Sequence, residues 1–288
     1  MRVRKAVIPV AGFGTRFLTA SKVVPKEMFT IVDKPILEIL VDECLEAGIE
    51  EVMLVIRDGK EIAIKHFEVN EELEKNLKEN NKTELYNLLQ TSNLIDKIKV
   101  VKQEEQLGFP HAIYMAKEFV GNEPFVLCTG DELVLNKENN SIKQLINAYS
   151  ETGKSILGVS YTPDDELRNY GIIKYEKFGD FLKILDIVEK PKSNAPSNFA
   201  SNGKYLFEAK IFDVIERKLK NSTSEVMIPD CILDLAKADD MLAYEIQGIR
   251  CDTGNKFGFI KANIDYGLQS DEIKDKLKAY LKELVDKF

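Results

Sequence analysis

Two basic side chains, Arg16 and Lys26, follow a glycine-containing turn near the N-terminus. The turn, Ala11 to Gly14, follows the apolar run Ala6 to Ile8, which is typical of a buried strand. After such a strand, backbone N–H groups of a glycine turn can face an anion, because no side chain blocks its approach. With the two cations, this pattern predicts a nucleoside triphosphate site. A tight turn with incidental basic residues stays the alternative, since a lone glycine pair is weak evidence.

Two familiar phosphate-binding loops do not match this turn. A Walker loop needs glycine, four residues and then Gly-Lys-Ser/Thr, and no such string occurs. A dinucleotide-binding loop needs a third glycine where Phe17 stands, and an acidic residue at the end of the next strand, which is missing. The sequence therefore argues against a nicotinamide-dependent dehydrogenase.

Further polar residues follow other expected strands. Gln103 and Gly108 come after the strand 98–102, and Asp131 comes after the strand 124–128. Ligands collect at the carboxyl ends of strands in open α/β sheets, so these residues are expected to flank the same cleft as the glycine turn. A carboxylate held there suits Mg²⁺, although Asp131 alone could also be a solvent-facing turn residue.

Two more charged positions lie later in the chain. Asp252 stands in a glycine turn before the expected helix 256–268. Glu189 and Lys190 end a strand and precede Pro191, and taken alone they would form a surface salt bridge.

Bulk composition limits the classes of function. The chain has 288 residues, 44% hydrophobic and 31% charged, as in an ordinary soluble globular protein. The net charge of -8 argues against a general nucleic-acid binder and leaves a local cationic cleft for a small anion. The chain lacks a run of about 18 apolar residues and begins with a strand rather than a signal peptide. We therefore expect a cytoplasmic protein that contacts neither membranes nor nucleic acid.

The four cysteines are far apart and form no Cys-x-x-Cys pair. This spacing argues against a zinc site and a disulfide scaffold, and it predicts reduced, mostly buried thiols.

The elements that position these residues begin with an alternation of strands and helices. An expected helix at 36–47 leads to a strand at 51–56, and further strands are expected at 98–102, 124–128 and 155–159. Strand, helix and strand at this spacing form a βαβ unit, so we predict a parallel sheet flanked by helices.

The pattern changes in three places. Residues 60–93 alternate acids and bases with leucines at helical spacing, which predicts a helical excursion with solvated faces. After Tyr161, strands at 183–189 and 204–207 lack intervening helices, so we expect an antiparallel part. Residues 270–288 form an amphipathic helix, whose apolar stripe predicts core packing or, as the second interpretation, a subunit contact.

Five short motifs occur in order along the chain. They are GFGTRFL at 12–18, PKEM at 25–28, VDKP at 32–35, VEKP at 188–191 and CDTGN at 251–255. With these motifs the chain, from about Lys5 to Leu268, closely resembles the sugar nucleotidylyltransferase family and, within it, the bacterial UTP–glucose-1-phosphate uridylyltransferases. The resemblance implies a Rossmann-like mixed, mostly parallel sheet of the nucleotide-diphospho-sugar transferase type, with a small antiparallel part.

The resemblance also implies roles for particular residues. The catalytic set would neutralise phosphate charge, the nucleotide set would hold UTP, the sugar set would bind the sugar 1-phosphate, and two carboxylates would hold Mg²⁺. The catalytic set is Arg16, Lys26 and Lys190, and the nucleotide set is Ala11, Gly12, Gly14, Thr15, Gln103 and Gly108. The sugar set is Gly171, Glu189 and Lys190, and the metal carboxylates are Asp131 and Asp252.

The implied reaction is transfer of UMP from UTP to α-D-glucose 1-phosphate, giving UDP-glucose and pyrophosphate in a homodimer or homotetramer. The alternatives are a relative that uses dTTP or another hexose 1-phosphate, and a non-catalytic sugar-nucleotide-binding protein. The expected domain covers residues 1–268, with a nucleotide-binding part at about 1–160, a sugar-binding part at about 161–255, and the amphipathic helix at 269–288.

The chain departs from the family pattern at three points. Thr19 stands where the family usually has proline, and Pro110 stands where it usually has the second glycine of a Gly-Leu-Gly turn. Pro110 removes a backbone donor near the expected base pocket. Ser201 and Asn202 replace a more apolar pair, and Asn202 is expected to add a hydrogen-bonding group beside the sugar pocket.

Overall fold

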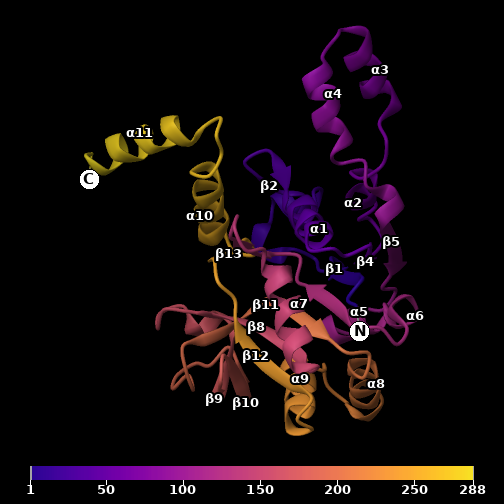
Figure 1. The fold of residues 1–288 in the computed structure, drawn as a ribbon, viewed down its shortest axis with the longest axis vertical. Coiled ribbons are helices and arrows are strands. Elements are labelled where there is room, and N and C mark those ends of the chain that lie inside the picture. The colour runs from indigo at the N-terminus through magenta and orange to yellow at the C-terminus, as the bar shows by residue number, and fades with distance from the viewer. Residues whose placement is uncertain (1, 288) are drawn as a thin grey trace.

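A nine-stranded mixed sheet forms the centre of the computed structural model, which describes residues 2–287 (Figure 1). This mixed sheet with helices on both faces confirms the expected fold class. Its strands, in spatial order, are β5 (Ile98–Lys102), β4 (Glu51–Ile56), β1 (Lys5–Pro9), β6 (Phe125–Cys128), β11 (Phe199–Phe207), β8 (Ser155–Tyr161), β12 (Met241–Glu245), β10 (Phe181–Glu189) and β9 (Gly171–Phe178).

The two ends of the sheet differ in strand direction. The strands β5, β4, β1 and β6 are parallel to one another, and β4, β1 and β6 are almost fully buried. Beyond β6, the pairings of β11 with β6 and β8, of β12 with β10, and of β10 with β9 are antiparallel, while β12 runs parallel to β8. The antiparallel part expected after Tyr161 is therefore present.

Helices cover both faces of the sheet because successive side chains of a strand point in opposite directions. Ala6 and Ile8 of β1 pack in the core cluster that includes α1 (Ile36–Glu46) and α7 (Ser141–Thr152). Val7 packs in the second cluster, which includes α5 (Phe109–Tyr114), α8 (Ile211–Asn221) and α9 (Ile228–Lys237). The result is three layers, with the sheet between two layers of helices.

Smaller elements surround these layers. Two short antiparallel pairs join β2 (Thr30–Ile31) to β3 (Lys34–Pro35) and β7 (Glu132–Leu135) to β13 (Ile249–Asp252). The excursion expected at 60–93 contains α2 (Ile62–Lys65), α3 (Glu71–Glu79) and α4 (Thr83–Gln90), and Figure 1 shows α3 and α4 projecting from the body. The other helices are α6 (Lys117–Val120), α10 (Lys256–Gly267) and α11 (Lys274–Val285).

The C-terminal helix α11 corrects one prediction. Core packing of its apolar stripe is wrong, because α11 buries no residue and extends away from the sheet beyond α10 (Figure 1). Tyr280 and Val285 are 56% and 71% exposed. Helical periodicity predicts an amphipathic helix but not the surface that covers its apolar face, so the subunit-contact interpretation stays a prediction.

All four cysteines are buried free thiols, as predicted. Within residues 2–287, every helix is too short or too polar to cross a lipid bilayer.

Candidate functional site

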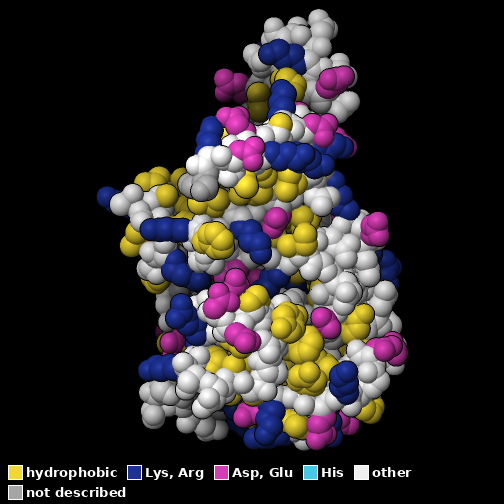
Figure 2. Space-filling view, turned by 90° about the vertical axis from the view of Figure 1, so that its left-hand side faces the viewer, with side chains coloured by type: hydrophobic (Ala, Val, Ile, Leu, Met, Phe, Trp, Pro, Cys, Tyr) yellow, Lys and Arg dark blue, Asp and Glu magenta, His cyan; other side chains and the backbone are white. Residues whose placement is uncertain are grey.

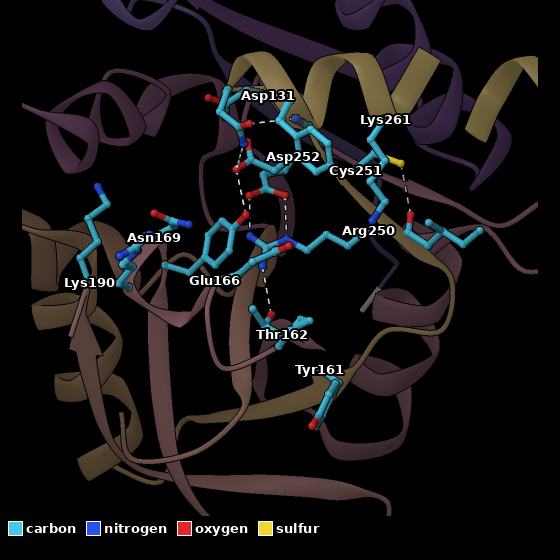
Figure 3. Close-up of a pocket in the computed structure, with 18 of the residues that line it drawn as sticks. Asp131, Tyr161, Thr162, Glu166, Asn169, Lys190, Arg250, Cys251, Asp252 and Lys261 are labelled. Carbon is cyan, nitrogen blue, oxygen red and sulfur yellow. Dashed lines mark hydrogen bonds and ion pairs between the residues drawn. The ribbon is translucent and has the colours of Figure 1, made fainter. Parts of the chain in front are cut away.

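Two cavities of about 790 and 350 Å³ adjoin beyond the carboxyl end of β6, where Asp131 lines both of them. Figure 2 shows basic and acidic side chains meeting near the middle of one face of the molecule, and Figure 3 shows the lining of the larger cavity. Because the two cavities share much of their lining, we treat them as one cleft. The shared residues are Arg16, Asp131, Glu132, Asn169, Tyr170, Lys190 and Arg250.

The glycine turn starts directly after β1, as predicted. Ala11 is buried, whereas Gly12 is exposed and a Cβ atom there would meet nothing within 4 Å. Gly14 has a φ of 67°, a left-handed conformation that glycine adopts without strain. Short 3₁₀ turns then carry the chain past Arg16 to Lys26.

A buried ion pair, which the sequence analysis missed, connects the two ends of this segment. Lys60 Nζ lies 2.5 Å from Glu27 Oε1 and also donates to the carbonyl oxygen of Val10. Both side chains are buried, so the expectation of solvated faces from residue 60 onward is wrong for Lys60. Burial lowers the pKa of Lys60, although the Glu27 carboxylate opposes this shift.

Asp131 and Asp252 come together through the β7–β13 pair. The ladder pairs Asp252 with Glu132, and the backbone N–H and hydroxyl of Thr253 each donate to the Asp131 carbonyl oxygen at 2.8 Å. A Cβ atom on Gly254 would lie 2.7 Å from Asp131 Oδ2 and 3.0 Å from Asp252 Oδ1. Both carboxylates therefore point toward this glycine, and any side chain there would fill the space between them.

Cations surround the Asp131 carboxylate. Lys26 Nζ donates to Asp131 Oδ2, and Arg16 Nη2 lies 3.5 Å from the same oxygen. Burial of Asp131 disfavours its charged form, but the Lys26 ammonium and then the Arg16 guanidinium outweigh burial and hold the pKa of Asp131 below its usual value. Asp131 is thus an ionised, charge-compensated carboxylate.

Neutral donors hold the Asp252 carboxylate. Oδ2 accepts hydrogen bonds of 2.9 Å from the Tyr170 hydroxyl and from Asn255 Nδ2, and Oδ1 accepts one of 2.8 Å from the Gly254 backbone. Burial, reinforced by the Asp252 charge, raises the pKa of Tyr170 well above its usual value. The hydroxyl therefore remains a donor at neutral pH.

Arg250 and Glu132 form a bidentate ion pair beside these groups, with Nε–Oε2 and Nη2–Oε1 distances of 3.0 and 2.5 Å. The Arg250 guanidinium also lies 3.7 Å from the centre of the Tyr170 ring. Burial raises the pKa of Glu132 despite the opposing Arg250 charge. Sequence reasoning missed Tyr170, Glu132 and Arg250, although the first two are next to the predicted residues Gly171 and Asp131.

The predicted sugar residues meet at the end of the β9–β10 pair. Gly171 is the ladder partner of Glu189, and a Cβ atom on Gly171 would lie 3.1 Å from Glu189 Oε2. Lys190 has a φ of 46° and its backbone N–H donates to the Tyr170 carbonyl oxygen at 2.9 Å. Its ammonium lies 3.4 Å from Glu189 Oε1, and its side chain is 63% exposed at the cleft.

The strand β11 corrects the expectation for Asn202. This side chain is fully buried, where Nδ2 donates to Ser160 Oγ at 3.1 Å. Ser201 and Tyr205 line the smaller cavity instead, and their hydroxyls lie 3.1 Å apart. The sequence alone could not show on which face of β11 Asn202 lies, because a shift of one position along a strand moves each side chain to the opposite face.

Gln103 and Gly108, which were expected to contact the uracil base, lie next to the cleft rather than on the walls of its two cavities. Gln103 is buried, and its Nε2 lies 3.2 Å from the Gly108 carbonyl oxygen and 3.0 Å from His111 Nδ1. The neighbouring Phe109 and Pro110 line the smaller cavity. Pro110 occupies the first turn of α5, where its missing N–H costs no intrahelical hydrogen bond.

The two carboxylates at Gly254 are the groups best placed for a metal ion. Within residues 2–287, three or more His, Cys, Asp or Glu side chains nowhere gather in a metal-binding arrangement. Two carboxylates supply only part of a shell, which suits a cation that takes its remaining oxygens from a ligand and from water.

Comparison with known proteins gives one consistent group of relatives. The sequence model of the nucleotidyl transferase family matches residues 5–268. The chain is 42% identical over 285 residues to UTP–glucose-1-phosphate uridylyltransferase 2 of Staphylococcus saprophyticus, which covers 98% of both chains. It is 41% identical to the UTP–glucose-1-phosphate uridylyltransferase of Staphylococcus haemolyticus, covering 98% of this chain and 99% of the relative.

Solved structures agree with these sequence matches. The UTP-bound UGPase of Acinetobacter baumannii superimposes with a TM-score of 0.87 at 36% identity, covering 98% of this chain and all of that one. A UDP-glucose pyrophosphorylase complexed with UDP-glucose gives a TM-score of 0.83 at 32% identity, covering 93% of this chain and all of that one.

Proposed function

The chain belongs to the nucleotidyl transferase family, and from this premise we propose that it transfers UMP from UTP to α-D-glucose 1-phosphate, giving UDP-glucose and pyrophosphate. One observation carries the proposal. Asp131 and Asp252 converge on Gly254, between the cations of the glycine turn and the Glu189–Gly171 pair, in a chain 42% identical to a UTP–glucose-1-phosphate uridylyltransferase.

On the nucleotide side, Arg16 and Lys26 neutralise the triphosphate. Both already contact a carboxylate in the cleft, so their charges lie where phosphate oxygens would arrive. We assign the pyrimidine edge to the Gln103 amide, whose Nε2 would have to leave the Gly108 carbonyl oxygen or His111 Nδ1 to donate to the base. The remaining nucleotide contacts are assigned to Ala11, Gly12, Gly14, Thr15 and Gly108.

On the sugar side, Gly171 and Glu189 bind hydroxyls of the sugar, and Lys190 pairs with its phosphate. The absence of a side chain on Gly171 leaves room beside the Glu189 carboxylate, which can accept hydrogen bonds from sugar hydroxyls. The positive φ of Lys190 sends its side chain to the cleft directly after β10.

We assign the metal position to Mg²⁺, held by Asp131 and Asp252. The fit rests on the two convergent carboxylates and on the preference of Mg²⁺ for one or two carboxylates plus substrate phosphates. When bound, Mg²⁺ would neutralise part of the negative charge that develops on the phosphates.

The chemistry needs little more than alignment. An oxygen of the sugar phosphate attacks the α-phosphorus of UTP in line, a new P–O bond forms, the α–β bridging bond breaks, and pyrophosphate leaves. The attacking phosphate is already ionised at neutral pH, so no side chain must remove a proton. Arg16, Lys26 and Lys190 hold the two phosphate groups together against their repulsion and stabilise the added charge of the transition state.

A different hexose 1-phosphate is the second candidate substrate. The hydroxyls of Ser201 and Tyr205 line the smaller cavity near Glu189, and they can bind a polar substituent of the sugar. The other candidate nucleotide, dTTP, differs from UTP by a methyl group on the base and by the absence of the ribose 2′-hydroxyl. A non-catalytic binding protein is disfavoured because both carboxylates and Lys26 are present.

We also propose a cytoplasmic homodimer or homotetramer. Buried free thiols are compatible with a reducing compartment, and the uncovered apolar stripe of α11 is compatible with a subunit contact. The nucleotide-binding part, about 1–160, would carry the glycine turn, and the sugar-binding part, about 161–255, would carry Glu189.

The test is pyrophosphate release with Mg²⁺, using UTP, dTTP, CTP and ATP against the 1-phosphates of glucose, galactose and N-acetylglucosamine. We expect the highest kcat/KM for UTP with glucose 1-phosphate. A preference for another pair would correct the substrate, and no turnover with any pair would favour the binding protein. The Lys26→Ala variant, purified in the same way, controls for contaminating activity.

A further inference from the structure

Tyr170 contacts both sides of the cleft. Its hydroxyl donates to Asp252 Oδ2 at 2.9 Å, and its backbone carbonyl oxygen accepts the hydrogen bond of 2.9 Å from the Lys190 backbone. One residue therefore connects a carboxylate assigned to the metal with the lysine assigned to the sugar phosphate.

The ring of Tyr170 is itself held in place. The Arg250 guanidinium stacks 3.7 Å from the ring centre, and Glu132 binds that guanidinium at both ends. Glu132 directly follows Asp131 in the chain. In Figure 3, Arg250 lies beside Asp252, with Lys190 across the cavity. The orientation of Tyr170 is thus tied to the strand that begins beside the other metal carboxylate.

The hydroxyl acts on the outer oxygen of Asp252. Oδ2 accepts from Tyr170 and Asn255, while Oδ1 accepts from the Gly254 backbone and is the oxygen that a Cβ atom on Gly254 would meet, together with Asp131 Oδ2. A donor on the outer oxygen fixes the rotation of the carboxylate and leaves the inner oxygen facing the metal position. Outer partners of this kind typically change metal affinity by about 10–100-fold when they are removed.

We propose that Tyr170 is a positioning residue, which holds Asp252 in its metal-binding orientation and links that orientation to the Lys190 turn. The inference rests on the proposed function, because the metal role of Asp252 is part of it. Tyr170 needs no contact with the reacting atoms in this role.

The first experiment measures turnover as a function of Mg²⁺ concentration in the Tyr170→Phe variant, which keeps the ring on Arg250 and removes only the hydroxyl. We expect the half-saturating Mg²⁺ concentration to rise about tenfold, with most of kcat recovered at high Mg²⁺. A general loss of structure would not be rescued by Mg²⁺. Tyr175→Phe is the matched control, because the Tyr175 ring packs edge-on against Phe199 and lines neither cavity of the cleft.

The second experiment needs no turnover. Calorimetric titration of Mg²⁺ into protein with UTP, and separately with pyrophosphate, should show about tenfold weaker metal binding in Tyr170→Phe than in the wild type. Thermal unfolding without metal and nucleotide checks that the variant folds like the Tyr175→Phe control.

The two proposals fail separately. Equal metal affinity in Tyr170→Phe and the wild type overturns the positioning role, even if the wild type turns over UTP and glucose 1-phosphate. A wild type that binds Mg²⁺ with UTP but makes no product overturns the proposed reaction, while the titration still decides the role of Tyr170. A wild type that binds no Mg²⁺ with either ligand overturns the positioning role.

Discussion

The two carboxylates at Gly254 lie in walls of opposite character. The cationic wall consists of Arg16 and Lys26 around Asp131. The neutral wall consists of Tyr170, Asn255 and the Gly254 backbone around Asp252. The same chemical group is therefore compensated by charge on one side and oriented by dipoles on the other.

The contrast between the two walls indicates how the cleft would receive its substrates. If Arg16 and Lys26 bind the triphosphate as proposed, the nucleotide must compete with Asp131 for them. The donors of the neutral wall carry no net charge, so a triphosphate would not draw them away from Asp252. We infer that Asp252 is in position before the nucleotide arrives, whereas the surroundings of Asp131 rearrange as it binds.

The largest effect is expected where the cationic wall is anchored. Lys60→Met leaves the buried Glu27 carboxylate without its partner, which typically costs about 3–5 kcal/mol in free energy of unfolding. Urea denaturation measures this loss. Lys65→Met, on an exposed lysine nearby, is the control, and adding Glu27→Gln to Lys60→Met should recover part of the stability. A loss below about 1 kcal/mol would show that the pair does not support the wall.

The next effect tests the cationic wall itself. Lys26→Ala removes a charge at the triphosphate, and we expect turnover to fall by about two orders of magnitude or more, the scale of one lost charge-stabilising contact. The exposed Lys22, in the same segment, provides the control as Lys22→Ala. Steady-state kcat with saturating UTP and glucose 1-phosphate decides the matter, and near-normal turnover would reject the role of Lys26.

A third prediction separates the two walls directly. Asp131→Ala and Asp252→Ala should each reduce turnover about 100-fold, through loss of a metal ligand. Without metal they should differ. Asp131→Ala frees Lys26 and Arg16 and should bind UTP about fivefold more tightly than the wild type, roughly 1 kcal/mol for a relieved ion pair, whereas Asp252→Ala should bind it equally.

Calorimetry with UTP in the presence of a chelator measures this difference. Equal affinities of the two variants for UTP would show that the two walls do not differ in this way.

The sequence was most informative where a candidate residue directly follows a strand. The sheet, and the positions of the glycine turn and Asp131 at strand ends, could be predicted because apolar runs locate strands and ligands collect at their carboxyl ends. Glu189, which taken alone would form a surface salt bridge, became a candidate only through its family motif. Asp252 was found through its family motif and its turn.

What could not be predicted depends on contacts between distant residues. Tyr170 meets Asp252 across 82 positions, and Arg250 meets Glu132 across 118. Neither pair has a spacing that sequence periodicity could reveal. The sequence predicted that Lys60 begins a solvated segment, whereas in the structure Lys60 is buried beside the glycine turn. The faces of Ser201 and Asn202 depend on strand register in the same way.

The smallest effect concerns pH. Burial opposes ionisation of Asp131, but Lys26 and Arg16 outweigh it and lower the pKa, so ionised Asp131 contributes stability that is fully present above the ordinary aspartate pKa of about 3.9. This contribution should disappear as the pH falls through the lowered value. The difference in unfolding free energy between wild type and Asp131→Asn, measured in urea from about pH 6 to pH 3, should therefore shrink below about pH 4. With Lys26→Met in both proteins the shrinkage should weaken, and a difference that is constant with pH would contradict the compensation of Asp131 by the cationic wall.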